Sequence, residues 1–193
     1  MDTPMITDGV LIQRYIAGNQ AAFETLLKRH RTRIFTSIYV LVNDRYLAED
    51  IFQEVFIKVV QSVNAGKYNH EDKFLPWAMR IARNLSIDHI RSRKRMPMVT
   101  DSEGGDIFDN IGLFEKSPEQ LRIEKDKNAH LRSLIWKLPE EQREVLVLRH
   151  YADLSFKEIA ALTNSNLNTC IGRMHYAVLN LRKMMQKNSV VVK

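Results

Sequence analysis

The side chains that could support acid–base or metal chemistry are scattered along this chain of 193 residues. Only one adjacent Asp–His pair occurs, Asp88-His89, and no other histidine or acid stands at a spacing typical of metal ligands. The chain also lacks a glycine-rich phosphate loop and the strand-to-helix turn that presents a nucleophilic serine. We therefore expect no catalytic residues, no metal site and no cofactor, and the remaining patterns favour binding over catalysis.

Residues 155–176 carry the pattern best suited to binding DNA. Ser155 and Glu158 are spaced as a capping box at the start of a short helix. Asn164 suits a left-handed turn at its end, and Asn166 can cap the next helix. Two short helices joined in this way predict a helix-turn-helix, whose second helix enters the major groove. A helical hairpin in an ordinary bundle is the alternative, which the capping box, turn and basic flank together disfavour.

The second of these helices has a buried and an outward side. Cys170, Met174, Ala177 and Leu181 recur at helical spacing and should be buried. The outward residues are Asn168, Ile171, Gly172, His175 and Tyr176, with Arg173 on the flank. Gly172 either permits close approach to DNA or is simply tolerated, at about 1 kcal/mol of helix stability relative to alanine. Cys170 is interpreted as a small core side chain, with redox sensing as the alternative.

The distribution of charge indicates an anionic partner. The net charge is +6, with +5 in residues 1–95, −4 in residues 96–118 and +5 in residues 119–193. The acidic segment holds three of the seven glycines and is expected to be a flexible linker between two helical domains. No run reaches the roughly 18 apolar residues of a membrane span. A single cysteine and an N-terminus without a basic region predict a cytoplasmic protein without membrane insertion.

Four helices are expected in the first half of the chain. Residues 8–18 should form a helix that ends at Gly18 and buries Val10, Leu11, Tyr15 and Ile16. A second helix should begin at Asn19 or Gln20, and a third should span residues 47–63. The third helix has a polar stripe of Asp50, Gln53 and Glu54. Such a stripe commonly serves only solvation, but it could also dock against a basic partner helix.

A polar loop, residues 66–73, precedes a cationic fourth helix in which Pro76 suits the first turn. Its expected packed stripe is Trp77, Ile81, Leu85 and Ile90, and the residues that point elsewhere are Arg80, Arg83, Asn84, Asp88 and Arg91. The helix closes on Arg91, Arg93, Lys94 and Arg95. These cations exceed what the helix dipole needs, which favours contact with phosphates.

Taken in order, these motifs resemble the extracytoplasmic-function (group four) class of the sigma-70 family. The resemblance rests on DIFQEVFIKV, FLPWAMRIARNLSIDHIRSRKR, the acidic linker, LPEEQREVLVLRHYADLSFKEIA and the helix-turn-helix, which span nearly the whole chain. It implies an all-α initiation subunit of RNA polymerase without catalytic activity. Sigma domain 2 would occupy residues 1–95, the linker residues 96–118, and sigma domain 4 residues 119–193.

The resemblance also assigns roles to residues. Asp50, Gln53 and Glu54 would contact the clamp helices of the polymerase β′ subunit. The −10 promoter element would be melted, and one of its bases captured, by Tyr68, Asn69, His70, Arg80, Arg83, Asn84, Arg91, Arg93, Lys94 and Arg95. Trp77 could stack on a base but is better explained as core. The −35 element would be read by Asn168, Thr169, Ile171, Gly172, Arg173, His175 and Tyr176. Further partners would be the β flap and an anti-sigma factor.

The recognition helix departs from the usual pattern of this family. That pattern places Lys or Arg where Ile171 and Tyr176 stand, and a small polar residue where Gly172 stands. Loss of two cations weakens the phosphate contribution to binding, so the sequence predicts no particular −35 element. Two other hypotheses remain: a conventional helix-turn-helix regulator, which would not need the Asp50 stripe, and a protein-binding module without affinity for DNA.

Overall fold

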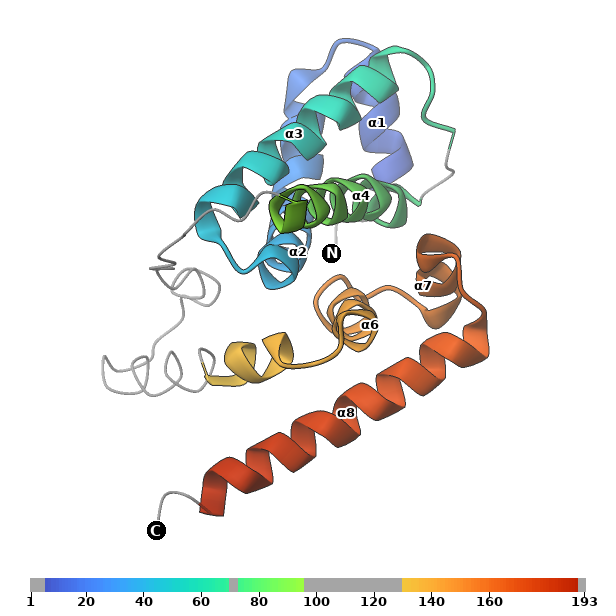
Figure 1. The fold of residues 1–193 in the computed structure, drawn as a ribbon. Coiled ribbons are helices and arrows are strands. Elements are labelled where there is room, and N and C mark those ends of the chain that lie inside the picture. The colour runs from blue at the N-terminus through green and yellow to red at the C-terminus, as the bar shows by residue number, and fades with distance from the viewer. Residues whose placement is uncertain (1–5, 70–72, 96–129, 191–193) are drawn as a thin grey trace, which may run out of the picture. The chain divides into compact units, whose positions relative to one another are not determined.

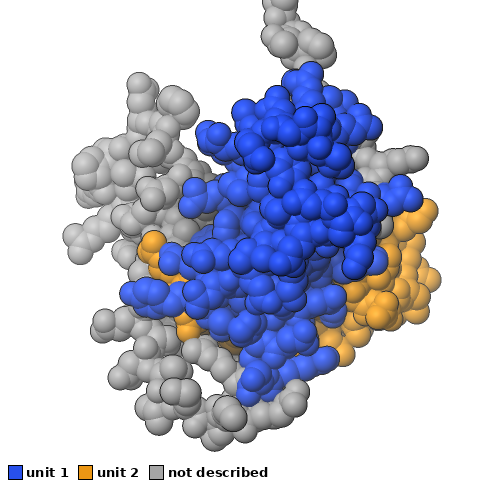
Figure 2. Space-filling view, turned by 90° about the horizontal axis from the view of Figure 1, so that it is seen from above, with its two compact units in different colours: residues 1–42, 46–99 blue, residues 43–45, 100–193 orange. Residues whose placement is uncertain are grey.

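The computed structural model describes residues 6–69, 73–95 and 130–190, and every regular element in these ranges is a helix. The chain divides into two compact units (Figure 2). The first comprises residues 1–42 and 46–99, and the second comprises residues 100–193 with 43–45. The predicted all-α fold with two helical domains is confirmed, whereas the predicted linker, residues 96–118, lies outside the described residues.

The first unit contains α1 (Asp8–Ile16), α2 (Gln20–Val42), α3 (Arg45–Asn64) and α4 (Phe74–Arg95) (Figure 1). The Thr7 hydroxyl accepts a hydrogen bond from the Val10 amide at 3.4 Å and caps α1. Gly18, with φ +97°, takes the left-handed conformation that follows the end of α1. The Asn19 side chain accepts from the Ala22 amide at 3.3 Å, so α2 begins where the sequence predicted.

The buried side of α1 differs from the prediction. Leu11 and Ile12 are buried, whereas Val10 and Ile16 are exposed. The reason is an anchor at the start of the helix: Asp8 contacts Arg29 (Oδ1 to Nη1, 2.6 Å) and His30 (Oδ2 to Nε2, 2.7 Å). This contact turns the face that carries residues 8, 11, 12 and 15 toward α2, against which α1 packs.

Aromatic contacts join the other helices of this unit. Phe23 and Phe35 of α2 meet Phe56 and Phe52 of α3, with ring centroids 6.3 and 5.6 Å apart. His30 meets Phe74, the first residue of α4, at 5.3 Å. The two Phe–Phe pairs are edge-to-face, a geometry that contributes about 0.5–1.5 kcal/mol beyond the buried area. Phe74, Ile51 and Val55 are completely buried and form the middle of the core.

The packed stripe of α4 was predicted only in part. Leu85 is buried as expected, but Trp77, Ile81 and Ile90 are only half-buried. Ala78, Met79 and Ala82 are fully buried instead. Small side chains at 78 and 82 let α4 lie close to α2, its principal neighbour, and this places the larger side chains at the edge of the contact.

The second unit has a helical segment at residues 130–136, followed by α6 (Glu140–His150), α7 (Phe156–Thr163) and α8 (Leu167–Val190) (Figure 1). Both α6 and α7 pack on α8. The buried Arg143 of α6 ties the first segment to this core. Its guanidinium donates to the Trp136 carbonyl at 3.2 Å and lies 4.1 Å from the centroid of the Trp136 ring.

Candidate nucleic-acid and polymerase interfaces

The helix-turn-helix has the predicted local geometry. The Glu158 amide donates to the Ser155 hydroxyl at 3.3 Å, and the Ser155 amide donates to the Glu158 carboxylate at 2.7 Å, so both halves of the capping box are present. Asn164 adopts the left-handed conformation, with φ 50° and ψ 43°. The Asn166 side chain accepts from the Thr169 amide at 2.7 Å and caps α8. These contacts set the direction in which α8 leaves the turn.

A chain of hydroxyl and thiol groups holds the turn between α7 and α8. The Thr163 hydroxyl donates to the Ile159 carbonyl at 2.8 Å and therefore accepts from Ser165, 2.7 Å away. The Ser165 oxygen lies 3.1 Å from the Cys170 sulfur, and since the Ser165 hydrogen is used by Thr163, the Cys170 thiol donates to Ser165. Cys170 is completely buried, as its place on the packed side of the helix predicted.

The outward side of α8 is polar and apolar rather than cationic. Asn168 and His175 are exposed, Ile171 is 45% exposed and Tyr176 59% exposed. Thr169 is half-buried beside them. Gly172 lies in the middle of this surface, and a Cβ atom built on it would meet nothing within 4 Å. Packing within the protein therefore does not require a glycine at this position.

Arg173 is held at the flank of α8 by an acid of α6. Its Nη2 atom lies 3.3 Å from Oε2 of Glu141, and the Arg173 side chain is 25% exposed against 70% for Glu141. The sequence patterns did not reveal this partner, which is 32 positions earlier in the chain. Arg173 must leave Glu141, or share it, before it can contact a phosphate.

The polar stripe on α3 lies at the surface and is accompanied by apolar side chains. Asp50 and Gln53 are exposed. Glu54 is half-buried and reaches Lys58 (Oε1 to Nζ, 3.2 Å) and His89 of α4 (Oε2 to Nε2, 3.8 Å). Two exposed residues missed by the sequence analysis extend the row: Tyr46, 76% exposed, and Ile57, 56% exposed. Their positions relative to Asp50, i−4 and i+7, could have identified them.

The residues expected to meet the −10 element lie on and before α4. Arg80, Asn84 and Arg91 are exposed on one face of the helix, and Arg83 is half-buried beside them. Asn69 is exposed, whereas Tyr68 packs edge-on against Trp77, with centroids 4.7 Å apart. Trp77 therefore supports the loop residue Tyr68. His70 and the side chains of Arg93, Lys94 and Arg95 lie outside the described part of the chain.

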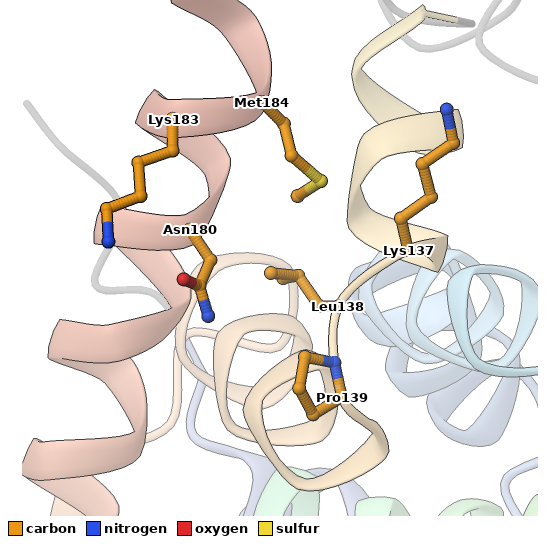
Figure 3. A pocket seen from close by; sticks show the side chains of 6 residues that line it. All are labelled: Lys137, Leu138, Pro139, Asn180, Lys183 and Met184. Carbon is orange, nitrogen blue, oxygen red and sulfur yellow. The ribbon is translucent and has the colours of Figure 1, made fainter. Parts of the chain in front are cut away.

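A cleft opens between α8 and the segment that joins residues 130–136 to α6 (Figure 3). Leu138, Pro139, Asn180 and Met184 line it, together with Lys137 and Lys183. Leu138 and Met184 point into the gap between the helices. Asn180 donates to the Gln142 side chain at 2.9 Å. The cleft thus combines two apolar side chains that point into it with two lysines whose side chains extend away from it.

In residues 6–69, 73–95 and 130–190, no three histidine, cysteine or acidic side chains gather in a way that could hold a metal ion. Within the same ranges, no helix combines the length and apolar character that a bilayer span requires.

Comparison with known proteins identifies the family. Residues 26–96 match the family described as Sigma-70 region 2, and residues 130–181 match the one described as Sigma-70, region 4. The ECF RNA polymerase sigma factor SigW of Bacillus subtilis is 31% identical over 179 residues, which cover 91% of this chain and 95% of the relative. The chain belongs to the extracytoplasmic-function family of sigma factors.

Solved structures agree with the fold of this sigma factor. CnrH, in a complex with the cytosolic domain of CnrY, has a TM-score of 0.68 at 22% identity, over 93% of this chain and 97% of that one. The sigma factor RpoE, in a complex with the anti-sigma factor NepR from Bartonella quintana, has a TM-score of 0.67 at 17% identity, over 85% and 96%. The predicted family, and with it a role in promoter-specific initiation of transcription, is confirmed.

Proposed function

We propose that this sigma factor docks on core RNA polymerase and holds two promoter elements through separate domains. Residues 1–95 would bind polymerase and open the −10 element, residues 119–193 would anchor the −35 duplex, and residues 96–118 would link them. The observation that carries the proposal is that this chain matches both sigma regions in order. Its capped helix-turn-helix supports the same conclusion. The chain would act by position alone, without catalytic chemistry or a cofactor, in the cytoplasm.

The α3 surface is the proposed contact with the β′ clamp helices. It is defined by Tyr46, Asp50, Gln53 and Ile57, with Glu54 at its edge. Exposed apolar side chains beside an acid suit a partner that is itself amphipathic, since apolar contact contributes affinity and charge contributes orientation. Glu54 is already engaged with Lys58 and His89, so Asp50 is the acid most available for a cation of the partner.

The exposed face of α4 is the proposed contact with the −10 element. Arg80 and Arg91 supply positive charge for phosphates, and Asn84 between them supplies both donors and acceptors for a base edge. Tyr68, supported by Trp77, would provide a stacking surface for an extruded base. His70, Arg93, Lys94 and Arg95 stay predictions for this same surface.

In the second unit, the outward side of α8 would enter the major groove. The cleft shown in Figure 3 would hold the β flap, because Leu138 and Met184 offer apolar contact and the lysines around them would attract acidic side chains. An anti-sigma factor, as in the complex of RpoE with NepR, would compete for these surfaces.

A charge reversal on α3 tests the docking step. Asp50→Lys should weaken binding to purified core polymerase by tenfold or more and lower promoter-dependent transcription in proportion. The matched control is Glu24→Lys, the same charge reversal on an exposed residue of α2 that pairs with Lys28. Equal loss in both variants would reject a specific docking surface. Full polymerase binding and transcription by Asp50→Lys would reject α3 as the docking surface.

A further inference from the structure

The outward side of α8 offers no freely presented cation. Arg173 is the sole charged residue between Glu158 and Arg182, and Glu141 holds its guanidinium. Recognition of guanine in the major groove relies mostly on Arg or Lys, which donate two hydrogen bonds to the O6 and N7 atoms. In the first three turns of α8, the one side chain of the type that usually selects G·C pairs is therefore engaged in an ion pair.

The same side offers apolar contact and an amide. Leu167 and Ile171, one turn apart near the start of α8, are both exposed. Thymine is the base that presents a methyl group in the major groove, and apolar side chains recognise it by contact. Asn168, exposed next to Leu167, has the side chain that pairs with adenine through its N6 and N7 atoms.

Gly172 creates a gap in the middle of this surface. Asn168 lies one turn before it, and His175 and Tyr176 lie one turn after it. The backbone at Gly172 is helical and a Cβ there would meet nothing, so neither conformation nor packing explains an unfavourable helix residue. A glycine at this position lets the helix backbone approach a ligand closely, and a groove-bound helix provides such a ligand.

We propose that α8 reads A·T pairs in the −35 element: Asn168 contacts an adenine, and Ile171 with the Gly172 gap receives the methyl group of a neighbouring thymine. This inference rests on the proposed function and adds the class of base pair that the helix selects. Tyr176, 59% exposed, lies one turn beyond Gly172 at the edge of the gap.

The test uses the holoenzyme formed from core polymerase and the full chain. Transcription from a promoter library randomised in its upstream region should enrich A·T pairs at adjacent −35 positions. In an enriched promoter, each contacted thymine is then replaced by deoxyuridine, which removes the methyl group and keeps every hydrogen bond. Each replacement should weaken holoenzyme binding about fourfold, which corresponds to about 0.8 kcal/mol for one methyl-sized group.

Two variants connect this effect to the named residues. Ile171→Ala should abolish the difference between thymine and deoxyuridine, whereas Met185→Ala, which truncates a comparably exposed apolar side chain on the same helix, should keep it. Gly172→Ala should weaken promoter binding about tenfold while raising resistance to denaturant, a combination that misfolding cannot produce.

Enrichment of G·C pairs at these positions, or equal binding of thymine and deoxyuridine probes, would overturn the inference. So would an Ile171→Ala variant that keeps the difference between thymine and deoxyuridine, since Ile171 would then not contact the methyl group. Absence of any promoter-dependent transcript would instead overturn the proposed function and the inference together.

Discussion

Replacement of Glu141 in α6 by glutamine should release Arg173 of the recognition helix from its ion pair without disturbing the fold. The Arg173–Glu141 pair joins α8 to α6 at 3.3 Å, but Glu141 is 70% exposed. An ion pair this accessible to water contributes at most about 1 kcal/mol to stability. The Glu141→Gln change should therefore have little effect on unfolding while it leaves Arg173 available to a phosphate.

The size of the effect on DNA binding follows from counterion release. One additional phosphate contact makes the slope of log K against log salt steeper by about 0.9. Between 50 and 200 mM salt, the variant should lose about 3.5 times more affinity than the unmodified protein over the same interval. At the lower salt concentration it should bind promoter DNA more tightly.

Fluorescence anisotropy of labelled promoter DNA with holoenzyme, measured across that salt range, provides the comparison. Glu140→Gln, which removes the same charge from the neighbouring position in α6, should leave the slope unchanged. The double variant Glu141→Gln with Arg173→Ala should return to the original slope. An unchanged slope in Glu141→Gln would refute the idea that Glu141 withholds Arg173 from DNA.

Three further predictions concern the stability of the chain. Burial, assisted by Arg29 and Arg33, lowers the pKa of His30 below its usual value despite the opposing carboxylate of Asp8. The contribution of neutral His30 to the unfolding free energy should therefore be fully present above about pH 6.5 and should decrease as the pH falls below that value. Denaturant titrations at pH 5 and 8 should show a smaller difference for His30→Gln, and an identical difference would contradict this role. Ser155→Ala removes the α7 cap and should lower the free energy of unfolding by about 1 kcal/mol in the same titrations. An unchanged free energy would show that the capping box does not stabilise the chain. Phe74→Ala should cost about 3–5 kcal/mol because the ring is completely buried against His30, Tyr68 and Trp77, and a cost below 1 kcal/mol would disprove that packing.

Features set by neighbouring residues were predictable from the sequence. The capping box of Ser155, the left-handed Asn164 and the start of α2 after Gly18 each depend on a few adjacent positions. The surface location of Asp50 and Gln53 followed from helical periodicity alone. Such features can be predicted because the capping side chains bond backbone groups of their own turn, independently of distant contacts.

Features decided by distant partners were not predictable. The face of α1 depends on the contact of Asp8 with Arg29 and His30, which no local pattern reveals. The restraint on Arg173 likewise depends on Glu141 in another helix. The exposure of Tyr46 and Ile57 had a periodic signal but was not predicted, because large apolar residues are usually expected to be buried.

Promoter-dependent transcription by purified core RNA polymerase tests the central claim most directly. Genomic DNA fragments would be transcribed with and without this protein, and the start sites would be mapped by sequencing. The account predicts new starts that appear only with the protein and share two upstream motifs, the more distant of them rich in A·T pairs. Intact duplex binding without any new start would contradict it and identify the chain as a DNA-binding protein that does not direct polymerase.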